Sequence, residues 1–154
     1  MDFQEFVGHF DPNLFVPELK ARTREEALTE MVDVLAKNKD LKDKNLILQM
    51  LTRRENLGST GIGHGVAIPH GRTLSVSRMF AIFGRSTEGI PFDAIDGEPV
   101  HLIFMIIAPP HEQNQDYLPF LGKLVEILRE ESYREQLTRC ENFDQFIDIL
   151  AGGF

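Results

Sequence analysis

A glycine-rich stretch near the middle of the chain, residues 58–72 (GSTGIGHGVAIPHGR), carries the residue types best suited to chemistry. Its glycines permit positive φ angles and close approach of the backbone, which a loop that surrounds an anion requires. Pro69 and Gly71 flank His70 at the end of the short apolar segment 66–68. We therefore expect the imidazole of His70 to be accessible for a reaction rather than buried in the core.

Phosphoryl transfer through His70 is the simplest chemistry for this arrangement. Neutral imidazole is a good nucleophile near pH 7, and while one ring nitrogen attacks phosphorus the other holds its proton against an acceptor such as a backbone carbonyl. The product carries about two negative charges, which N–H groups, hydroxyls or a guanidinium must offset. The loop amides, Ser59, Thr60, Arg54 and Arg72 lie within reach along the chain. The alternative is a glycine-rich turn with an incidental histidine, which an isolated glycine loop does not exclude.

Two longer motifs carry a family resemblance. Residues 54–72 (RENLGSTGIGHGVAIPHGR) resemble the active-site segment of the fructose/mannitol-type enzyme IIA domains of the bacterial sugar phosphotransferase system, nearest to their nitrogen-regulatory branch. Residues 90–110 (IPFDAIDGEPVHLIFMIIAPP) resemble the second characteristic block of that family. With the helices on either side, the resemblance covers about residues 12 to 150. Two long motifs in the right order are more specific than one glycine loop, so the chain is identified as a member of this family.

The resemblance implies roles for individual residues of the first motif. His70 matches the phosphate-accepting histidine, and Arg54 matches the active-site arginine, which would grip phosphate through two hydrogen bonds. Arg54 could instead be a solvated cation at a helix end, and Glu55 would orient it or cap a surface helix. His64 would touch the phosphoryl group or be a solvated loop side chain. The candidate phosphate-binding residues beside the catalytic pair are Ser59, Thr60, Gly61, His64 and Gly71.

The chain departs from the family pattern after Pro110. Many relatives carry a second histidine at the start of the following long helix, close to the acceptor. Aligning that helix by its apolar stripe places Tyr117 at this position, with His111 as a substitute if the loop folds back. A tyrosine hydroxyl donates one hydrogen bond but does not become cationic. We therefore expect His70 to accept phosphate but to pass it on slowly, which suits a regulatory carrier better than sugar uptake.

The resemblance implies a phosphocarrier that receives its phosphoryl group from a small histidine-phosphorylated carrier protein. No metal or organic cofactor is needed. The absence of a fused transporter domain favours a stand-alone nitrogen-type regulator with a target protein over a sugar-specific component that phosphorylates a permease. Two other classes remain: an unphosphorylated interaction module on the same fold, and a metal site. The metal site is disfavoured because its four histidines lack carboxylate or thiolate support; these are His64, His70, His101 and His111.

Composition excludes several classes of protein. The 154 residues, 42% of them apolar, suffice for one domain, residues 1–154, with its own core. A net charge of −8 and the lack of a dense Lys/Arg run argue against nucleic-acid binding. One cysteine, Cys140, suits a reducing cytosol and is expected at a partly buried helix end. The longest apolar run, residues 102–108, is too short for membrane insertion, so we expect a cytoplasmic protein.

The elements that position these residues mix strands and helices. The nearly continuous apolar runs 79–83 and 100–108 predict strands that are buried on both faces, hence a three-layer α/β/α fold with a mixed sheet. Thr23 and Glu26 form a capping box that opens one helix, and Asp43 can cap a second helix that delivers Arg54 to the glycine loop. The inward stripe of the first helix is Ala27, Leu28, Met31, Val32 and Leu35.

The two ends of the chain complete this layout. Phe3, Phe6, Val7 and Phe10 fall on one side of a short helix, and residues 14–16 form the first strand. Residues 115–129 predict a long helix, followed by a helical turn at 133–137 and a last helix at 143–150. His9 is expected on the surface. The inward face of the long helix is predicted to be Leu118, Leu121, Val125 and Leu128.

Overall fold

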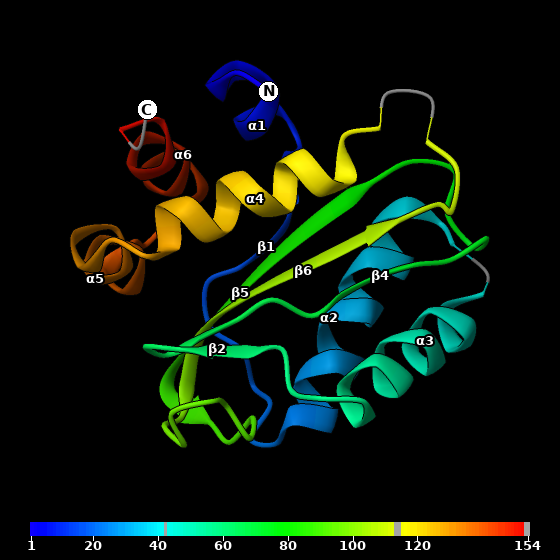
Figure 1. Cartoon of the computed structure of the whole chain (residues 1–154), viewed down its shortest axis with the longest axis horizontal. Coiled ribbons are helices and arrows are strands. Elements are labelled where there is room, and N and C mark those ends of the chain that lie inside the picture. Colours follow the sequence, from blue (N-terminus) through cyan, green and yellow to red (C-terminus); the bar gives the residue numbers. More distant parts are fainter. Residues whose placement is uncertain (42, 113–114, 153–154) are drawn as a thin grey trace.

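A computed structural model describes residues 1–41, 43–112 and 115–152 (Figure 1). The helices are α1 (Phe3–Gly8), α2 (Arg24–Lys39), α3 (Lys44–Asn56), α4 (Tyr117–Leu128), α5 (Glu131–Arg139) and α6 (Phe143–Ala151). The strands are β1 (Phe10–Val16), β2 (Gly61–Gly63), β3 (Val66–Ala67), β4 (His70–Arg72), β5 (Phe80–Ile90) and β6 (Val100–Ala108). The predicted β6 has the observed bounds, and the predicted α2, α5 and α6 are present.

The sheet is mixed, as predicted. Its strand order is β1-β5-β6-β3-β2, and β4 also pairs with β6. Strands β5 and β6 are antiparallel, whereas β1 runs parallel to β5 and both β3 and β4 run parallel to β6. Helices α2 and α3 cover one face, and α1, α4, α5 and α6 cover the other (Figure 1). This arrangement confirms the three-layer α/β/α prediction.

The continuous apolar run of β6 serves two cores. Phe104 and Ile106 pack with α4 and α6, while Met105 and Ile107 pack with α2 and α3. Successive side chains of a strand point to opposite faces, so a strand covered on both sides is apolar at nearly every position, and the one polar residue of β6, His101, lies half-buried near its start. The apolar run is therefore the sequence mark of a sheet with helices on both faces.

Strands β3 and β4 form one line along β6, interrupted by a proline. Val66 lies opposite Leu102 and His70 lies opposite Ile106, so the register is unchanged across the break. Proline has no N–H and cannot donate to the ladder, but the Pro69 carbonyl still accepts the Ile106 N–H at 2.9 Å. Within the described residues, no strand pairs with the outer edge of β4. His70 therefore opens a short edge strand.

The helix starts agree only in part with the capping predictions. At α2 the Thr23 hydroxyl oxygen accepts the Glu26 N–H at 3.1 Å, but the Glu26 carboxylate accepts the Arg22 N–H instead of closing the box. Asp43 stands at the N-cap of α3, yet its side chain makes no capping bond. The predicted inward stripe of α2 is buried throughout.

Strand β1 begins earlier than predicted. Phe10 belongs to β1 and not to the helix before it, because α1 already ends at Gly8. The strand was expected only over residues 14–16, but it also contains Pro12, and its register shifts between Phe10 and Phe15. Since β1 is at the end of the sheet, an edge strand accommodates this proline.

The buried face of helix α4 is rotated from the predicted one. Leu128 is buried as predicted, and Leu121 and Val125 pack half-buried against the core, but Leu118 is 67% exposed. The centre of the buried face is formed by Tyr117, Phe120 and Leu124. The sequence of α4 carries two overlapping apolar stripes, and the stripe that contains the aromatic rings removes more surface from water. As a result Tyr117 turns inward, toward the end of β4. Among the helices of the described residues, none is long and apolar enough to cross a membrane.

Candidate functional site

The His70 imidazole is fixed by a single backbone contact. Its Nδ1 lies 2.6 Å from the carbonyl oxygen of Ile68. A carbonyl only accepts hydrogen bonds, so Nδ1 carries the proton and Nε2 carries the free lone pair. The residue is half-buried at the start of β4. This combination of an oriented ring, a defined tautomer and an available Nε2 is what a nucleophilic histidine requires.

Gly71 allows β4 to lie against α3. A Cβ atom at this position would lie 2.1 Å from the sulfur of Met50. Because side chains alternate along the strand, Gly71 faces α3 while His70 and Arg72 face the side of α4. The prediction that Gly71 contacts phosphate stays a prediction, and its packing against Met50 gives it a structural role.

The glycine-rich segment forms a hairpin of β2 and β3 rather than an open loop. Gly61 packs closely, because a Cβ there would lie 2.8 Å from the Ala94 Cβ and 2.9 Å from its Cα. His64 lies at the hairpin tip with a φ of 57°, and its N–H donates to Asp96 Oδ2 at 2.9 Å. The tip lies beside the start of β6, whereas His70 pairs near the end of β6. The structure therefore does not bring His64 beside His70.

An arginine and a tyrosine lie beside His70, and a second arginine comes from the end of α3. From the last turn of α3, Arg54 Nη1 donates to the Gly58 carbonyl at 2.7 Å. The Arg72 guanidinium lies 4.6 Å from the centroid of the Tyr117 ring, and its Nη1 donates to the Pro110 carbonyl at 2.9 Å. The Tyr117 ring centroid lies 6.5 Å from that of His70. Arg72 of β4 and Tyr117 of α4 thus lie beside the imidazole, whereas the bond of Arg54 ties α3 to the loop before β2.

Three charged side chains act on the ionisation of the Tyr117 hydroxyl. Burial raises the pKa of Tyr117 to about 12, while the guanidinium groups of Arg72 and Arg54 act in the opposite direction and Glu112 adds to the rise. Arg72 and Tyr117 therefore lie together at the sheet edge that His70 opens, and the charge of Arg54, from the layer on the other side of the sheet, also acts on Tyr117.

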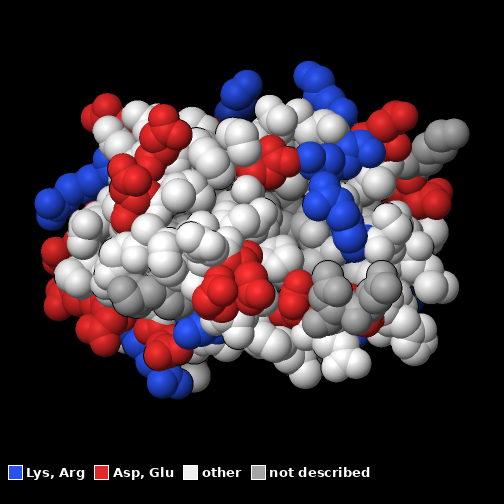
Figure 2. Space-filling view, turned by 90° about the horizontal axis from the view of Figure 1, so that it is seen from above, with Lys and Arg blue, Asp and Glu red and all other residues white. Residues whose placement is uncertain are grey.

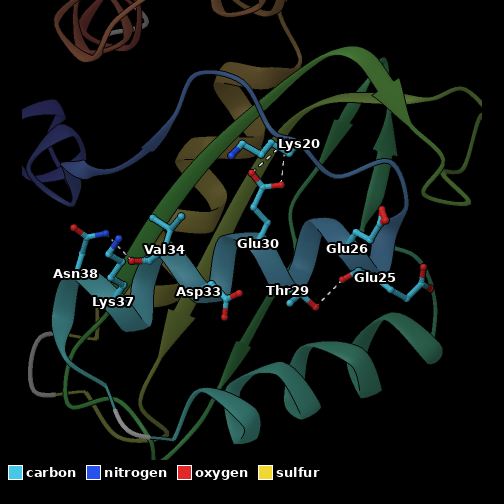
Figure 3. Close-up of a pocket in the computed structure, with 9 residues that line it drawn as sticks. All are labelled: Lys20, Glu25, Glu26, Thr29, Glu30, Asp33, Val34, Lys37 and Asn38. Atoms are coloured by element: carbon cyan, nitrogen blue, oxygen red, sulfur yellow. Dashed lines mark hydrogen bonds between the residues drawn. The ribbon is translucent and has the colours of Figure 1, made fainter.

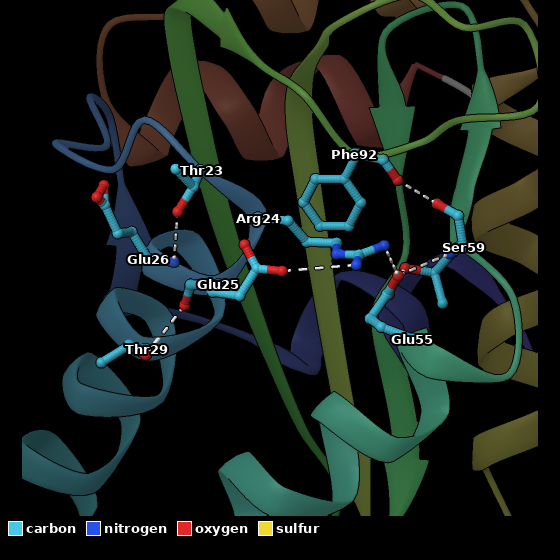
Figure 4. Close-up of polar contacts among 9 residues, drawn as sticks. Thr23, Arg24, Glu25, Glu26, Thr29, Glu55, Ser59 and Phe92 are labelled. Carbon is cyan, nitrogen blue, oxygen red and sulfur yellow. Dashed lines mark hydrogen bonds and ion pairs between the residues drawn. The ribbon is translucent and has the colours of Figure 1, made fainter.

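Glu55 organises the loop between α3 and β2 (Figure 4). Glu55 is buried, with 4% of the residue exposed. Its carboxylate accepts hydrogen bonds from the Thr60 N–H, at 3.1 Å, and from the Thr60 hydroxyl. Arg24 Nη1 lies 3.8 Å from the same carboxylate. The expectation that Glu55 orients Arg54 or caps a surface helix is wrong. The missed signal is spacing, because Ile47, Leu51 and Glu55 lie four residues apart on the buried stripe of α3.

The predicted phosphate ligands Ser59 and Thr60 are bonded within the protein. The Ser59 hydroxyl donates to the Phe92 carbonyl at 2.5 Å and accepts the Gly61 N–H at 3.0 Å (Figure 4). The Thr60 hydroxyl donates to Glu55, and Thr60 is 3% exposed. Their role as phosphate ligands stays a prediction. The bonds give both residues a second role, which is to hold the start of the hairpin in place.

The other histidines have separate environments. His101 Nδ1 lies 2.8 Å from the Ser86 carbonyl, in agreement with the structural role expected for it. His9 is half-buried rather than on the surface, because it pairs with Asp116 at 3.4 Å and packs edge-on against Phe120. His111 is exposed in the hollow that Arg72 also lines. In residues 1–41, 43–112 and 115–152, no three His, Cys, Asp or Glu side chains are grouped to hold a metal ion.

A separate hollow follows α2 (Figure 3). Glu30 extends across it and accepts the N–H groups of Lys20 at 3.0 Å and Ala21 at 2.9 Å, which ties the preceding segment to the helix. Its lining also contains Glu25, Glu26 and Asp33 against only two lysines. This acidic lining disfavours a phosphate group.

Basic side chains gather on one part of the surface. Figure 2 views the molecule from the side of α1 and α4, and it shows several Lys and Arg side chains next to one another near the end where α4 begins. The net charge of the chain is −8. The basic group is therefore a local feature of an acidic molecule.

Comparison with known proteins gives a family context. Residues 9–152 match the family described as "Phosphoenolpyruvate-dependent sugar phosphotransferase system, EIIA 2". The chain is 39% identical over 132 residues to the "PTS system fructose-specific EIIABC component" of Bacillus subtilis, a match that covers 86% of this chain and 21% of that longer protein. It is 32% identical to the "Nitrogen regulatory protein" of Bradyrhizobium diazoefficiens, over 91% of this chain and 90% of that protein. The crystal structure of "Nitrogen Regulatory Protein IIA-Ntr from Neisseria meningitidis" superimposes with a TM-score of 0.86 and 32% identity, over 95% of this chain and 99% of that chain.

Proposed function

Because the chain belongs to the EIIA 2 family of the phosphoenolpyruvate-dependent sugar phosphotransferase system, we propose that it accepts a phosphoryl group on His70 from a histidine-phosphorylated carrier protein. Membership in the family confirms the resemblance inferred from residues 54–72 and 90–110. The observation that carries the proposal is the bond between His70 Nδ1 and the Ile68 carbonyl at 2.6 Å, since it leaves Nε2 as the nucleophile.

The transfer step follows from this geometry. The Nε2 lone pair attacks phosphorus, the new Nε2–P bond forms as the P–N bond of the donor breaks, and the electron pair of that bond returns to the donor imidazole. The Nδ1 proton of His70 stays on its carbonyl acceptor throughout. Arg54 and Arg72 offset the charge of the phosphoryl group in transit. No metal or organic cofactor takes part in the proposed step.

Exposed leucines accompany the site residues in sequence. Leu57 (86% exposed) follows Arg54, Leu74 (88%) follows Arg72, and Leu118 (67%) follows Tyr117. Apolar side chains beside basic ones suit a transient complex, in which the apolar centre is buried and the charges speed association. We propose these leucines as the surface on which the carrier protein docks, weakly and in the cytoplasm.

A regulatory, nitrogen-type carrier is the form of this function that we favour. Its supports are the similarity to a nitrogen regulatory protein over 90% of that protein's length and the presence of Tyr117 beside His70. The second candidate is a sugar-specific component that passes phosphate to a permease, which the 39% identity to a fructose-specific protein favours. In that case the phosphoryl group should be transferred rapidly from His70 to a fructose-type permease component.

The test is phosphorylation by phosphoenolpyruvate and the general components of the phosphotransferase system. We expect the wild-type chain to gain one acid-labile phosphate and His70→Ala to gain none. His111→Gln serves as the matched control, because His111 is exposed and should leave the final stoichiometry unchanged. A wild-type chain that stays unphosphorylated while a known EIIA in the same mixture is labelled would instead support an interaction module.

A further inference from the structure

Tyr117 is held beside His70 from two sides. It is the first residue of α4 and is 5% exposed. Its N–H donates to Glu112 Oε1 at 3.1 Å, which fixes the start of the helix, and the Arg72 guanidinium covers its ring at 4.6 Å. The ring therefore has a defined position, 6.5 Å from the imidazole of His70 between centroids. This separation is within the range of aromatic pairs, so a group attached to Nε2 would lie in the immediate neighbourhood of the Tyr117 ring.

The Tyr117 hydroxyl is a spare donor. Throughout residues 1–41, 43–112 and 115–152, no group forms a hydrogen bond with it, and no side-chain polar atom that is fully buried lacks a partner, so the hydroxyl oxygen of this otherwise buried residue is open to solvent or to a ligand. The charged groups that act on it are Arg72 from β4, Arg54 from α3 and Glu112 from the segment before α4. Two guanidiniums facing one phenol create a place that favours an anion.

Resting on the function proposed above, we propose that the Tyr117 hydroxyl donates a hydrogen bond to a phosphoryl oxygen on His70 Nε2. Arg72 has a positioning role in this arrangement, since it holds the ring while Arg54 approaches from the opposite layer. The Tyr117 hydroxyl forms no covalent bond with the phosphoryl group and keeps its proton.

A tyrosine in this place makes the interaction insensitive to pH. With a pKa of about 12, the hydroxyl remains a donor throughout the physiological range. An imidazole at the same position would lose its charge near its ordinary pKa of about 6.5. The contribution of Tyr117 to phosphate transfer should therefore be constant with pH, whereas that of a histidine should fall as pH rises.

The experiment compares Tyr117→Phe, Tyr117→His and Tyr133→Phe with the wild-type chain. Phosphoramidate serves as a small phosphoryl donor, so that docking of a carrier protein does not enter the rates. Tyr133→Phe is the matched control, because it removes the only other tyrosine hydroxyl, which donates to Gly152 at the opposite end of α4. Circular dichroism establishes that each variant is folded. The rate of phosphorylation and the ³¹P chemical shift of the phosphohistidine are measured between about pH 6.5 and 9.

We expect Tyr117→Phe to be phosphorylated about tenfold more slowly than wild type, by a factor that is constant with pH. Its phosphohistidine resonance should shift, and Tyr133→Phe should match wild type. Tyr117→His should exceed Tyr117→Phe at low pH and approach it at high pH. A folded Tyr117→Phe with the wild-type rate, or with a slower rate but an unmoved resonance, would overturn the hydrogen bond and leave His70 as the acceptor. A wild-type chain that takes no phosphate would overturn the proposed function itself.

Discussion

At the scale of single residues, the site depends on which nitrogen of His70 is free. The backbone carbonyl of Ile68 decides this, because it accepts the Nδ1 proton at 2.6 Å. His70 and Arg54 were accessible from the sequence as motif residues. The environment of Glu55 was not predicted from the sequence, because a carboxylate at a helix end is usually solvated. Only its position on the same helix stripe as Ile47 and Leu51 indicated that it is buried.

Arg54→Ala tests the guanidinium at the site. We expect phosphorylation of His70 to slow by about a hundredfold, because removal of one preorganised donor to a developing anion costs on the order of 3 kcal/mol. Thermal unfolding should be little changed, since the main bond of Arg54 is a peripheral one to the Gly58 carbonyl. Stopped-flow phosphorylation and a melting curve measure the two effects. Wild-type kinetics in this variant would remove Arg54 from the site.

Thr60→Val tests the buried carboxylate. The substitution removes the hydroxyl that donates to Glu55 and leaves a charged acceptor short of a partner in the interior. We expect a loss of about 1–3 kcal/mol in the free energy of unfolding, measured by urea denaturation. Thr60→Ser keeps the hydroxyl and should lose less than half as much. Equal losses in the two variants would show that the methyl group, and not the hydrogen bond, stabilises the loop.

At the scale of elements, some predictions followed from burial and others failed where two packings compete. Strand β6 was predicted to its bounds because nine residues without a charged side chain fit only a doubly covered strand. The position of helix α4 along the chain was predicted correctly, but its buried face was predicted with the wrong rotation about the helix axis, because the helix has two overlapping apolar stripes. The glycine segment was expected as an open loop, and it pairs as a hairpin because the contacts of Gly61 with Ala94 are not visible along the sequence.

Gly61→Ala tests how closely this hairpin packs. The added methyl group would meet the backbone and Cβ of Ala94 at 2.9 and 2.8 Å, and neither can rotate away. We expect the free energy of unfolding to fall by about 1–3 kcal/mol. Gly8→Ala is the matched control, since nothing lies within 4 Å of a Cβ there. If both variants unfold at the same urea concentration as wild type, the backbone at Gly61 does not pack as closely against Ala94 as the structure indicates.

At the scale of the whole molecule, charge is unevenly distributed over the surface. The hollow along α2 has a mainly acidic lining (Figure 3), whereas basic side chains gather near the start of α4 (Figure 2). The overall charge of −8 was available from the sequence, but its distribution requires the fold. An acidic molecule with a local basic end orients a negatively charged partner as it approaches.

Leu74→Asp together with Leu118→Asp tests the proposed docking surface. Both side chains are highly exposed, so the fold should tolerate the changes. We expect the KM for the phosphorylated carrier protein to rise about tenfold or more, because two apolar contacts are lost and two carboxylates are added. Phosphorylation by phosphoramidate should keep its rate. Leu46→Asp, an exposed leucine in the first turn of α3, is the control. An unchanged KM would place the carrier on another surface.

The unbroken register of β3 and β4 on β6 has a consequence for insertions and deletions. Since side chains alternate along the strand, the parity of the residue count between Val66 and His70 selects the layer toward which the imidazole points. Loss of one residue from this link would turn the ring toward Met50 and α3, away from Tyr117. Loss of two residues would restore the orientation of the ring, but His70 would then lie opposite Phe104 of β6 instead of Ile106. Length variation in this segment is thus a direct way to silence the protein without altering any of its reactive groups.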